Sequence, residues 1–157
     1  MKELLEYRVK MIARLAAAAD EFCSACMALS DPFTKVEGEW SAHQIAAHTR
    51  DVDKMIYGAR IRQTLHEEEP EFKSFDADAW MADHYNKAEL LKKILNDFSA
   101  SMDDLSNILQ SMPSESWSRE SRHETMGGGL TLQLWVERSL AHIEEHLLAL
   151  KNAAAAP

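Results

Sequence analysis

The chain has 157 residues, of which 46% are hydrophobic and 27% are charged, with only five Gly and four Pro and a formal net charge of −9. This composition predicts one globular domain, over residues 1–152 with a flexible tail at 153–157, and it favours helices. The negative charge argues against nucleic acid or an anionic membrane surface as a partner, because binding to either depends on neutralising phosphate groups.

The N-terminal sequence MKELLEYRVK carries charges throughout and has no apolar run, so it does not resemble a secretory signal. No stretch of the chain approaches the length of a membrane span. We therefore expect a cytoplasmic protein with no membrane segment.

The first helix is expected over residues 2–30, where apolar side chains recur at helical spacing until Asp31-Pro32 ends it. Cys23 and Cys26 form a C-x-x-C motif on the buried side of this helix. Redox C-x-x-C motifs lie at helix N-termini, so we interpret these cysteines as small packed side chains without a disulfide.

The second helix is expected from Ser41 to about residue 65, because Ser41 and Gln44 form a capping box. Trp40, just before the cap, is placed to pack back on Ile45. His48 lies on the apolar face of this helix.

Residues 66–85 are interpreted as a loop whose aromatic side chains cover the helices, with one helical turn near Ala79. Asn86 with Glu89 resembles the next N-cap and predicts a third helix over 87–110. The later segment Gly127-Gly128-Gly129 lacks the Lys-Ser/Thr of a phosphate loop, so we expect it to let the chain turn into the last helix.

The last helix is expected over residues 130–150, with an apolar stripe formed by Val136, Leu140, Ile143, Leu147 and Leu150. Four long amphipathic helices and no convincing strand predict an all-α fold, a four-helix bundle.

Beside that stripe, His142 and His146 lie one helical turn apart on the same side of the helix, about 6 Å between backbones. This spacing allows both imidazoles to bind one divalent cation. Such a pair also occurs by chance, or packs at a helix edge, so a metal site needs a third ligand from elsewhere. His48 is the best candidate, because it lies on the apolar face of another helix of the same bundle. Three imidazole ligands with an open fourth position are typical of a catalytic metal site.

The remaining histidines fit this site less well. His43 is expected to face away from His48, and His66 lies about 27 Å further along the same helix. His84 and His123 fall in expected loops and are interpreted as surface residues.

Two carboxylates are weaker candidates for a supporting role. Asp51 follows His48 by about one turn and is placed to accept a hydrogen bond from an imidazole, whereas Glu145 precedes His146. Either carboxylate is a candidate to orient a ligand or relay a proton, and an exposed surface role remains open for both.

Two known metal patterns fit the sequence poorly. The Glu-x-x-His motif of di-iron bundles is absent, because Ser139 and Ile143 stand three residues before the two histidines. The stretch from His142 to His146 matches H-x-x-E-H, but no acidic residue follows to complete the inverted zinc peptidase set.

Three stretches in order along the chain resemble the DinB/YfiT-like family, the damage-inducible metalloproteins. They are WSAHQIAAHTRDVD at 40–53, DADAW at 76–80 with Tyr85-Asn86, and GGLTLQLWVERSLAHIEEHLLAL at 128–150. The resemblance covers nearly the whole chain, with Thr49 as a mild departure where an apolar residue is usual.

The resemblance implies an up-down-down-up four-helix bundle, often dimeric, with a divalent metal, zinc or nickel, at His48, His142 and His146. It also implies a thiol-dependent S-transferase, in which a metal-activated low-molecular-weight thiol attacks an electrophilic substrate. A metal-dependent hydrolase, a non-catalytic metal-binding stress protein and an orphan bundle that binds no metal remain the alternatives.

Overall fold

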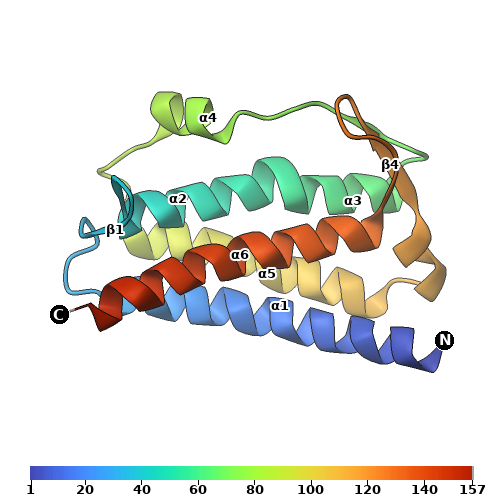
Figure 1. The fold of residues 1–157 in the computed structure, drawn as a ribbon, viewed down its shortest axis with the longest axis horizontal. Helices are drawn as coiled ribbons and strands as arrows, with labels where there is room; N and C mark the ends of the chain where they lie inside the picture. Colours follow the sequence, from blue (N-terminus) through green and yellow to red (C-terminus); the bar gives the residue numbers. More distant parts are fainter. Residues whose placement is uncertain (157) are drawn as a thin grey trace.

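The computed structural model describes residues 1–156 and shows four long helical segments side by side (Figure 1). The first is α1 (Lys2–Ala28), and the second is continuous through α2 (Ala42–Val52), η1 (Asp53–Tyr57) and α3 (Gly58–His66). The third is α5 (Leu91–Ser111) and the fourth is α6 (Leu132–Ala155). Followed from the N-terminus, their directions are up, down, down and up, so the predicted bundle topology is confirmed.

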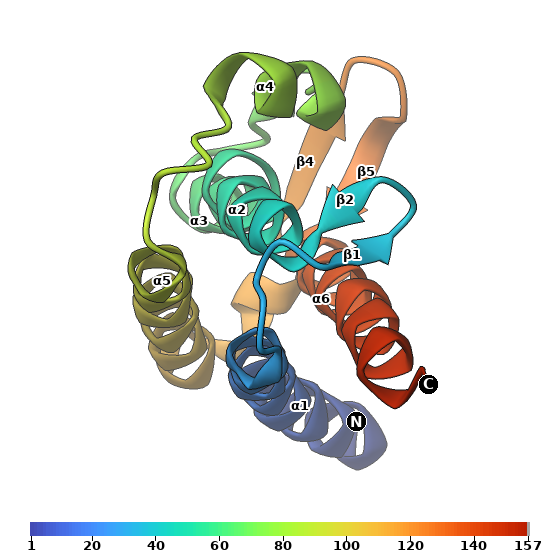
Figure 2. The same cartoon turned by 90° about the vertical axis from the view of Figure 1, so that its left-hand side faces the viewer.

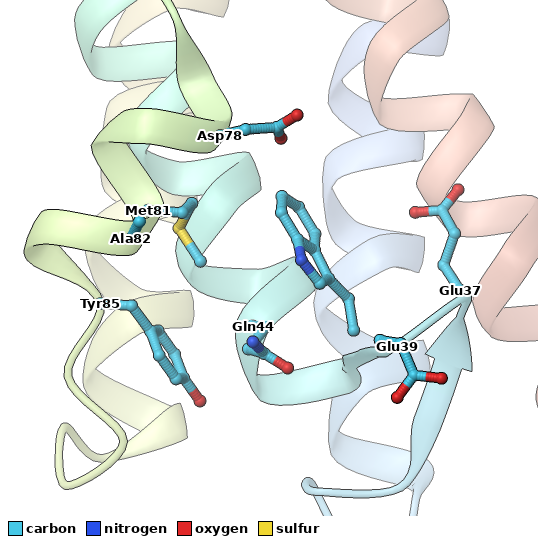
Figure 3. Close-up of a pocket in the computed structure, with 8 residues that line it drawn as sticks. Glu37, Glu39, Gln44, Asp78, Met81, Ala82 and Tyr85 are labelled. Carbon is cyan, nitrogen blue, oxygen red and sulfur yellow. The ribbon is translucent and has the colours of Figure 1, made fainter.

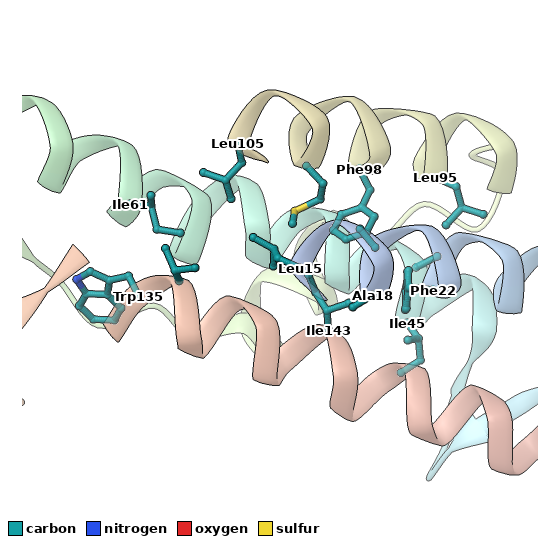
Figure 4. Packing of buried hydrophobic residues seen from close by; sticks show 14 of the residues in the cluster. Leu15, Ala18, Phe22, Ile45, Ile61, Leu95, Phe98, Leu105, Trp135 and Ile143 are labelled. Atoms are coloured by element: carbon teal, nitrogen blue, oxygen red, sulfur yellow. The ribbon is translucent and has the colours of Figure 1, made fainter. Parts of the chain in front are cut away.

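The four segments, seen end-on in Figure 2, enclose a continuous apolar core, part of which Figure 4 shows from close by. Every segment contributes fully buried side chains to it, among them Leu15, Phe22, Ile45, Phe98, Leu105, Trp135 and Ile143. Burial of large apolar side chains from all four segments holds the helix faces in one register, and that register positions the histidines.

Side-chain caps fix the starts of the two helices that carry the candidate histidines. At α2 the backbone N–H of Gln44 donates to Ser41 Oγ (3.2 Å) and Gln44 Oε1 accepts from the Ser41 N–H (2.9 Å), which confirms the predicted capping box. At α6 the Leu134 N–H donates to Thr131 Oγ1 (3.2 Å). Each cap satisfies an otherwise unpaired backbone group and defines the first residue of its helix.

The second segment was expected to be a regular helix, but its middle five residues, Asp53–Tyr57, form a π-helix. Gly58 follows directly, and a Cβ at that position would lie 2.6 Å from the Asp53 carbonyl oxygen and 2.7 Å from its Oδ1. The wider turn brings the Asp53 carboxylate over the Gly58 backbone, so glycine is the residue that fits there.

The expectation of no strand was wrong, because five short strands lie in the connections. β1 (Lys35–Glu37) pairs antiparallel with β2 (Trp40–Ser41). β4 (Glu120–His123) lies between β3 (Glu71–Phe72), to which it is parallel, and β5 (Gly127–Thr131), to which it is antiparallel. Strands of two to five residues are too short to show a period-2 hydrophobic pattern in the sequence.

Two other boundaries differ from the prediction. α5 begins at Leu91 rather than at residue 87, because the Asn86 side chain accepts from the Ala88 N–H (2.9 Å) and stabilises a separate turn. In the preceding connection α4 spans Ala77–His84, longer than the single turn expected, and Asp76 caps it by accepting from the Ala79 N–H (3.0 Å).

The ends of the first and last helices also differ from the prediction. α1 ends at Ala28, two residues before the predicted end, whereas α6 continues to Ala155, into the predicted tail 153–157, whose Pro157 lies outside the described residues. Across residues 1–156 no helix combines the length and the apolar character that crossing a membrane requires.

The C-x-x-C motif lies in the packed interior of α1, as predicted. Cys23 and Cys26 are both free thiols, and Cys26 is fully buried. Burial raises the thiol pKa of Cys23 to about 11 and that of Cys26 to about 12, so both are protonated and unreactive at neutral pH.

Candidate metal centre

The imidazoles of His48, His142 and His146 meet at one point between α2 and α6. Nε2 of His142 lies 3.0 Å from Nε2 of His48 and 3.1 Å from Nε2 of His146. One ring nitrogen from each residue lies within 4.8 Å of the others. The convergence predicted from the sequence is therefore present in the fold.

These distances fit one shared cation. Two imidazole nitrogens bound to one tetrahedral zinc ion lie about 3.3 Å apart, given Zn–N bonds of about 2.0–2.1 Å. The two Nε2 separations in this structure, 3.0 and 3.1 Å, are close to that value. Three nitrogen donors turned toward one point match the ligand chemistry of zinc and nickel.

The His146 ring is held in place by a carboxylate that sequence reasoning missed. Nδ1–H of His146 donates to Oε2 of Glu37 at 2.8 Å, across from β1 to α6. This bond leaves Nε2 of a neutral His146 free as a lone-pair donor facing the other two rings. A carboxylate behind a histidine ligand is the common arrangement in metalloproteins, where it fixes the tautomer and raises the basicity of the ligand.

Burial keeps two of the rings neutral. Desolvation, followed by repulsion from His146, lowers the pKa of His48 to about 4, against opposing attraction from Asp78 and Asp51. Desolvation, followed by repulsion from His146 and His48, lowers the pKa of His142 to about 3. Both imidazoles are therefore unprotonated at neutral pH, the form that a metal ligand requires.

Aromatic rings cover the site on two sides. The Trp40 ring packs edge-on against His48 with 4.9 Å between centroids, and Tyr57, the last residue of the π-helix, lies 5.7 Å from the His142 ring. Trp40 was expected to pack on Ile45, and the structure places it directly against a candidate ligand. These contacts restrict the rotation of both imidazoles.

A pocket of about 660 Å³ adjoins the triad. It is lined by Glu37, Glu39, Trp40, Gln44, Asp78, Met81, Ala82 and Tyr85, from β1, β2, α2, α4 and the connections beside them (Figure 3). Glu37 and Trp40 belong both to this wall and to the surroundings of the histidines. A molecule in the pocket therefore lies next to the site.

The two weaker carboxylate candidates are not hydrogen-bonded to the triad. Asp51 accepts from the Trp80 indole N–H (3.2 Å) and from Arg50 Nε (3.0 Å), so its carboxylate joins α4 to α2. Glu145 is exposed on α6. The carboxylate that does contact the triad is Glu37. No local sequence pattern could identify it, because its hydrogen bond to His146 spans 109 residues and depends on the β1–β2 hairpin.

Two other histidines are buried, and the interpretation of one of them was wrong. His43, expected to face away from His48, is not part of the triad. It is nevertheless only 1% exposed: its Nε2–H donates to the Glu89 carbonyl oxygen (2.6 Å) and its Nδ1 accepts from the Tyr85 hydroxyl (2.7 Å). His123 was expected on the surface and is instead buried in β4, a strand that the sequence did not reveal. His84 is exposed as expected, and His66, at the end of α3, is exposed as well.

Comparisons with known proteins agree with this fold. A sequence model described as the DinB superfamily matches residues 13–150. A solved structure of YfiT from Bacillus subtilis, described as a probable metal-dependent hydrolase with an unusual four-helix bundle topology, superposes with a TM-score of 0.85 at 20% identity, covering 95% of this chain and 86% of that one. No curated protein matches the sequence.

Proposed function

The chain belongs to the DinB superfamily, and from that membership and the converging imidazoles we propose that it is a metal-dependent enzyme. His48, His142 and His146 hold one divalent cation, zinc or nickel. The observation that carries the proposal is the set of three Nε2 atoms turned toward one point, with the Glu37 carboxylate behind His146.

The residues around the cation provide a catalytic rather than a closed structural arrangement. Because only three histidines would hold the cation, it would keep a position for a substrate atom, and the pocket of about 660 Å³ beside the triad is large enough for a small-molecule substrate. When bound, the cation lowers the pKa of a thiol or a water in that position. His48 and His146 are buried, and the Trp40 ring packs against His48, so both shield their ligand nitrogens from bulk water.

We propose that the reaction is S-transfer, in which a low-molecular-weight thiol supplies the nucleophile and the pocket holds the electrophile. The sulfur attacks an electrophilic carbon, the leaving group departs with the bonding pair, and the thiol proton passes to solvent. Two soft or borderline metals, zinc and nickel, bind thiolate sulfur well, which supports a thiol as the partner.

Hydrolysis is the second candidate, because YfiT is described as a probable metal-dependent hydrolase. The same open position then holds water instead of a thiol, and the ligand set is unchanged. A non-catalytic metal-binding role is the third candidate, and it requires that no substrate reach the open position.

Cobalt substitution tests the proposal and separates these candidates. We expect the cobalt protein to show the visible bands of a four-coordinate site and to develop a sulfur-to-metal band with the neutral thiol 2-mercaptoethanol. The His66→Ala protein is the control, because His66 is exposed and far from the triad. Ester cleavage without thiol, and no spectral response to thiol, would instead support the hydrolase, whereas no response to thiol and no turnover would support the non-catalytic role.

The resemblance also predicts a homodimer. Light scattering of the purified protein measures its mass in solution, and the monomer mass of 17.8 kDa gives the reference value.

A further inference from the structure

The pocket beside the triad presents hydrogen-bond acceptors and negative charge. Of its eight lining residues, all within the described chain, three are Glu37, Glu39 and Asp78, and none is Lys or Arg. Figure 3 shows Asp78 and Tyr85 on the α4 side and the two glutamates on the opposite side. The carboxylates therefore face the pocket from two separate elements.

These three carboxylates are neutralised to different degrees. Glu37 accepts from His146, and Glu39 pairs with Lys35 at 2.5 Å in a solvent-exposed contact that water and salt weaken. Asp78 forms no ion pair within residues 1–156. The lining therefore carries a net negative charge, to which Asp78 contributes the carboxylate without a cationic partner in residues 1–156.

Independently of these charges, the Tyr85 hydroxyl already uses its proton in a hydrogen bond inside the protein. The Glu89 carbonyl oxygen can only accept, so the proton of its 2.6 Å contact with His43 lies on Nε2. In a neutral imidazole Nδ1 is then unprotonated and acts as an acceptor. Tyr85 therefore donates its hydroxyl hydrogen to Nδ1 (2.7 Å). The Ser41 side chain also hydrogen-bonds to the Tyr85 oxygen, so what this oxygen can still offer a ligand is a lone pair and not a proton. Because His43 is 1% exposed, this orientation is held by the interior of the protein.

The rest of the pocket lining is apolar or uncharged. Trp40, Met81 and Ala82 supply apolar surface, and the two remaining donors, the Gln44 amide and the Trp40 indole N–H, are both neutral. A ligand that fits this wall carries hydrogen-bond donors and positive charge next to an apolar or ring portion. Indole and phenol faces also favour cations.

We propose that this pocket binds a compound bearing a protonated amine, and that this amine-bearing compound is the small-molecule substrate of the metal site. The first half of the proposal concerns charge and depends only on the pocket. The second half rests on the proposed function, since it needs a reacting group held beside the cation. Anionic thiols and anionic electrophiles are disfavoured by the same carboxylates.

The test uses three ring compounds of similar shape and different charge: benzylamine, benzyl alcohol and phenylacetate. Their dissociation constants are measured on the metal-free full chain by NMR titration, with the indole N–H signal of Trp40 as the reporter of the pocket. Metal-free protein keeps the result independent of whether the triad binds a cation. We expect benzylamine to bind about tenfold more tightly than phenylacetate, with benzyl alcohol between them, and the preference to shrink at high salt.

Asp78→Asn is the diagnostic variant, and Asp83→Asn is its control, because Asp83 is exposed on the same helix and does not line the pocket. Asp78→Asn is expected to weaken benzylamine about threefold, the size of one solvent-accessible ion pair, and to leave benzyl alcohol unchanged. Phenylacetate binding as tightly as benzylamine would overturn the proposal, and so would equal losses in the two variants. Neither result would affect the metal proposal, which the cobalt spectra test separately. If the cobalt protein showed no bands of a bound metal but benzylamine still bound preferentially, the pocket would remain an amine site and only the claim that the amine is the substrate of the metal site would fail.

Discussion

Glu37→Gln tests whether the carboxylate behind His146 supports metal binding. Glutamine keeps an oxygen that can accept from Nδ1–H of His146 but removes the negative charge, so the variant isolates the charge-assisted part of the 2.8 Å contact. Loss of such an outer carboxylate typically lowers metal affinity by about 10- to 100-fold. The Glu37 side chain is 35% exposed, so water screens it and we expect about tenfold, equivalent to about 1.4 kcal/mol.

Competition with a chromophoric chelator at fixed pH and ionic strength measures this change. Glu39→Gln is the matched control, because Glu39 lies two residues away and pairs only with exposed Lys35. Glu37→Ala should lose more affinity than Glu37→Gln, since it also removes the acceptor. Unchanged zinc affinity in Glu37→Gln, or an equal loss in Glu39→Gln, would refute the supporting role of Glu37.

Two further predictions concern the π-helix in the second segment. Gly58→Ala should lower the free energy of unfolding by about 1–3 kcal/mol despite the better helix propensity of alanine, because the new Cβ would meet the Asp53 carbonyl at 2.6 Å. In denaturant titrations Gly128→Ala should change stability much less, because the atoms nearest to its Cβ belong to the Arg122 side chain, which can move aside, and not to the backbone. Burial raises the pKa of Asp53 against the hydrogen bond from Ser101, so the wild type loses stability as pH rises from the unfolded pKa through the folded one. In denaturant titrations Asp53→Asn should therefore be more stable than the wild type at pH 8, and the difference should shrink as pH falls to the unfolded pKa. A gap that is absent, or widest at pH 4, would contradict the burial argument.

The helices that carry the histidines were predictable because their signals are local. The capping box at Ser41 and Gln44 is encoded within four residues, and the spacing of His142 and His146 follows from helical geometry. His48 could be selected as the third ligand because it lies on the apolar face of its helix, and that face must turn toward the rest of the bundle.

The supporting residues could not be predicted because they depend on contacts distant in sequence. Glu37 reaches His146 through a hairpin of two short strands, and His43 is buried because Tyr85 and Glu89 satisfy both ring nitrogens. Helical geometry placed His43 away from His48, but it could not show which part of the chain covers that side of the helix. The connection through α4 closes that side and forms one wall of the pocket.

The ligand role of the three histidines is tested most directly by metal stoichiometry. Metal-free wild type and His142→Ala are each dialysed against zinc, and the bound metal is measured by mass spectrometry of the digested protein, with circular dichroism to confirm that the variant is folded. We predict about one zinc ion per wild-type chain and much less in the variant. Equal zinc content in the two proteins, or none in the wild type, would contradict the proposed metal centre.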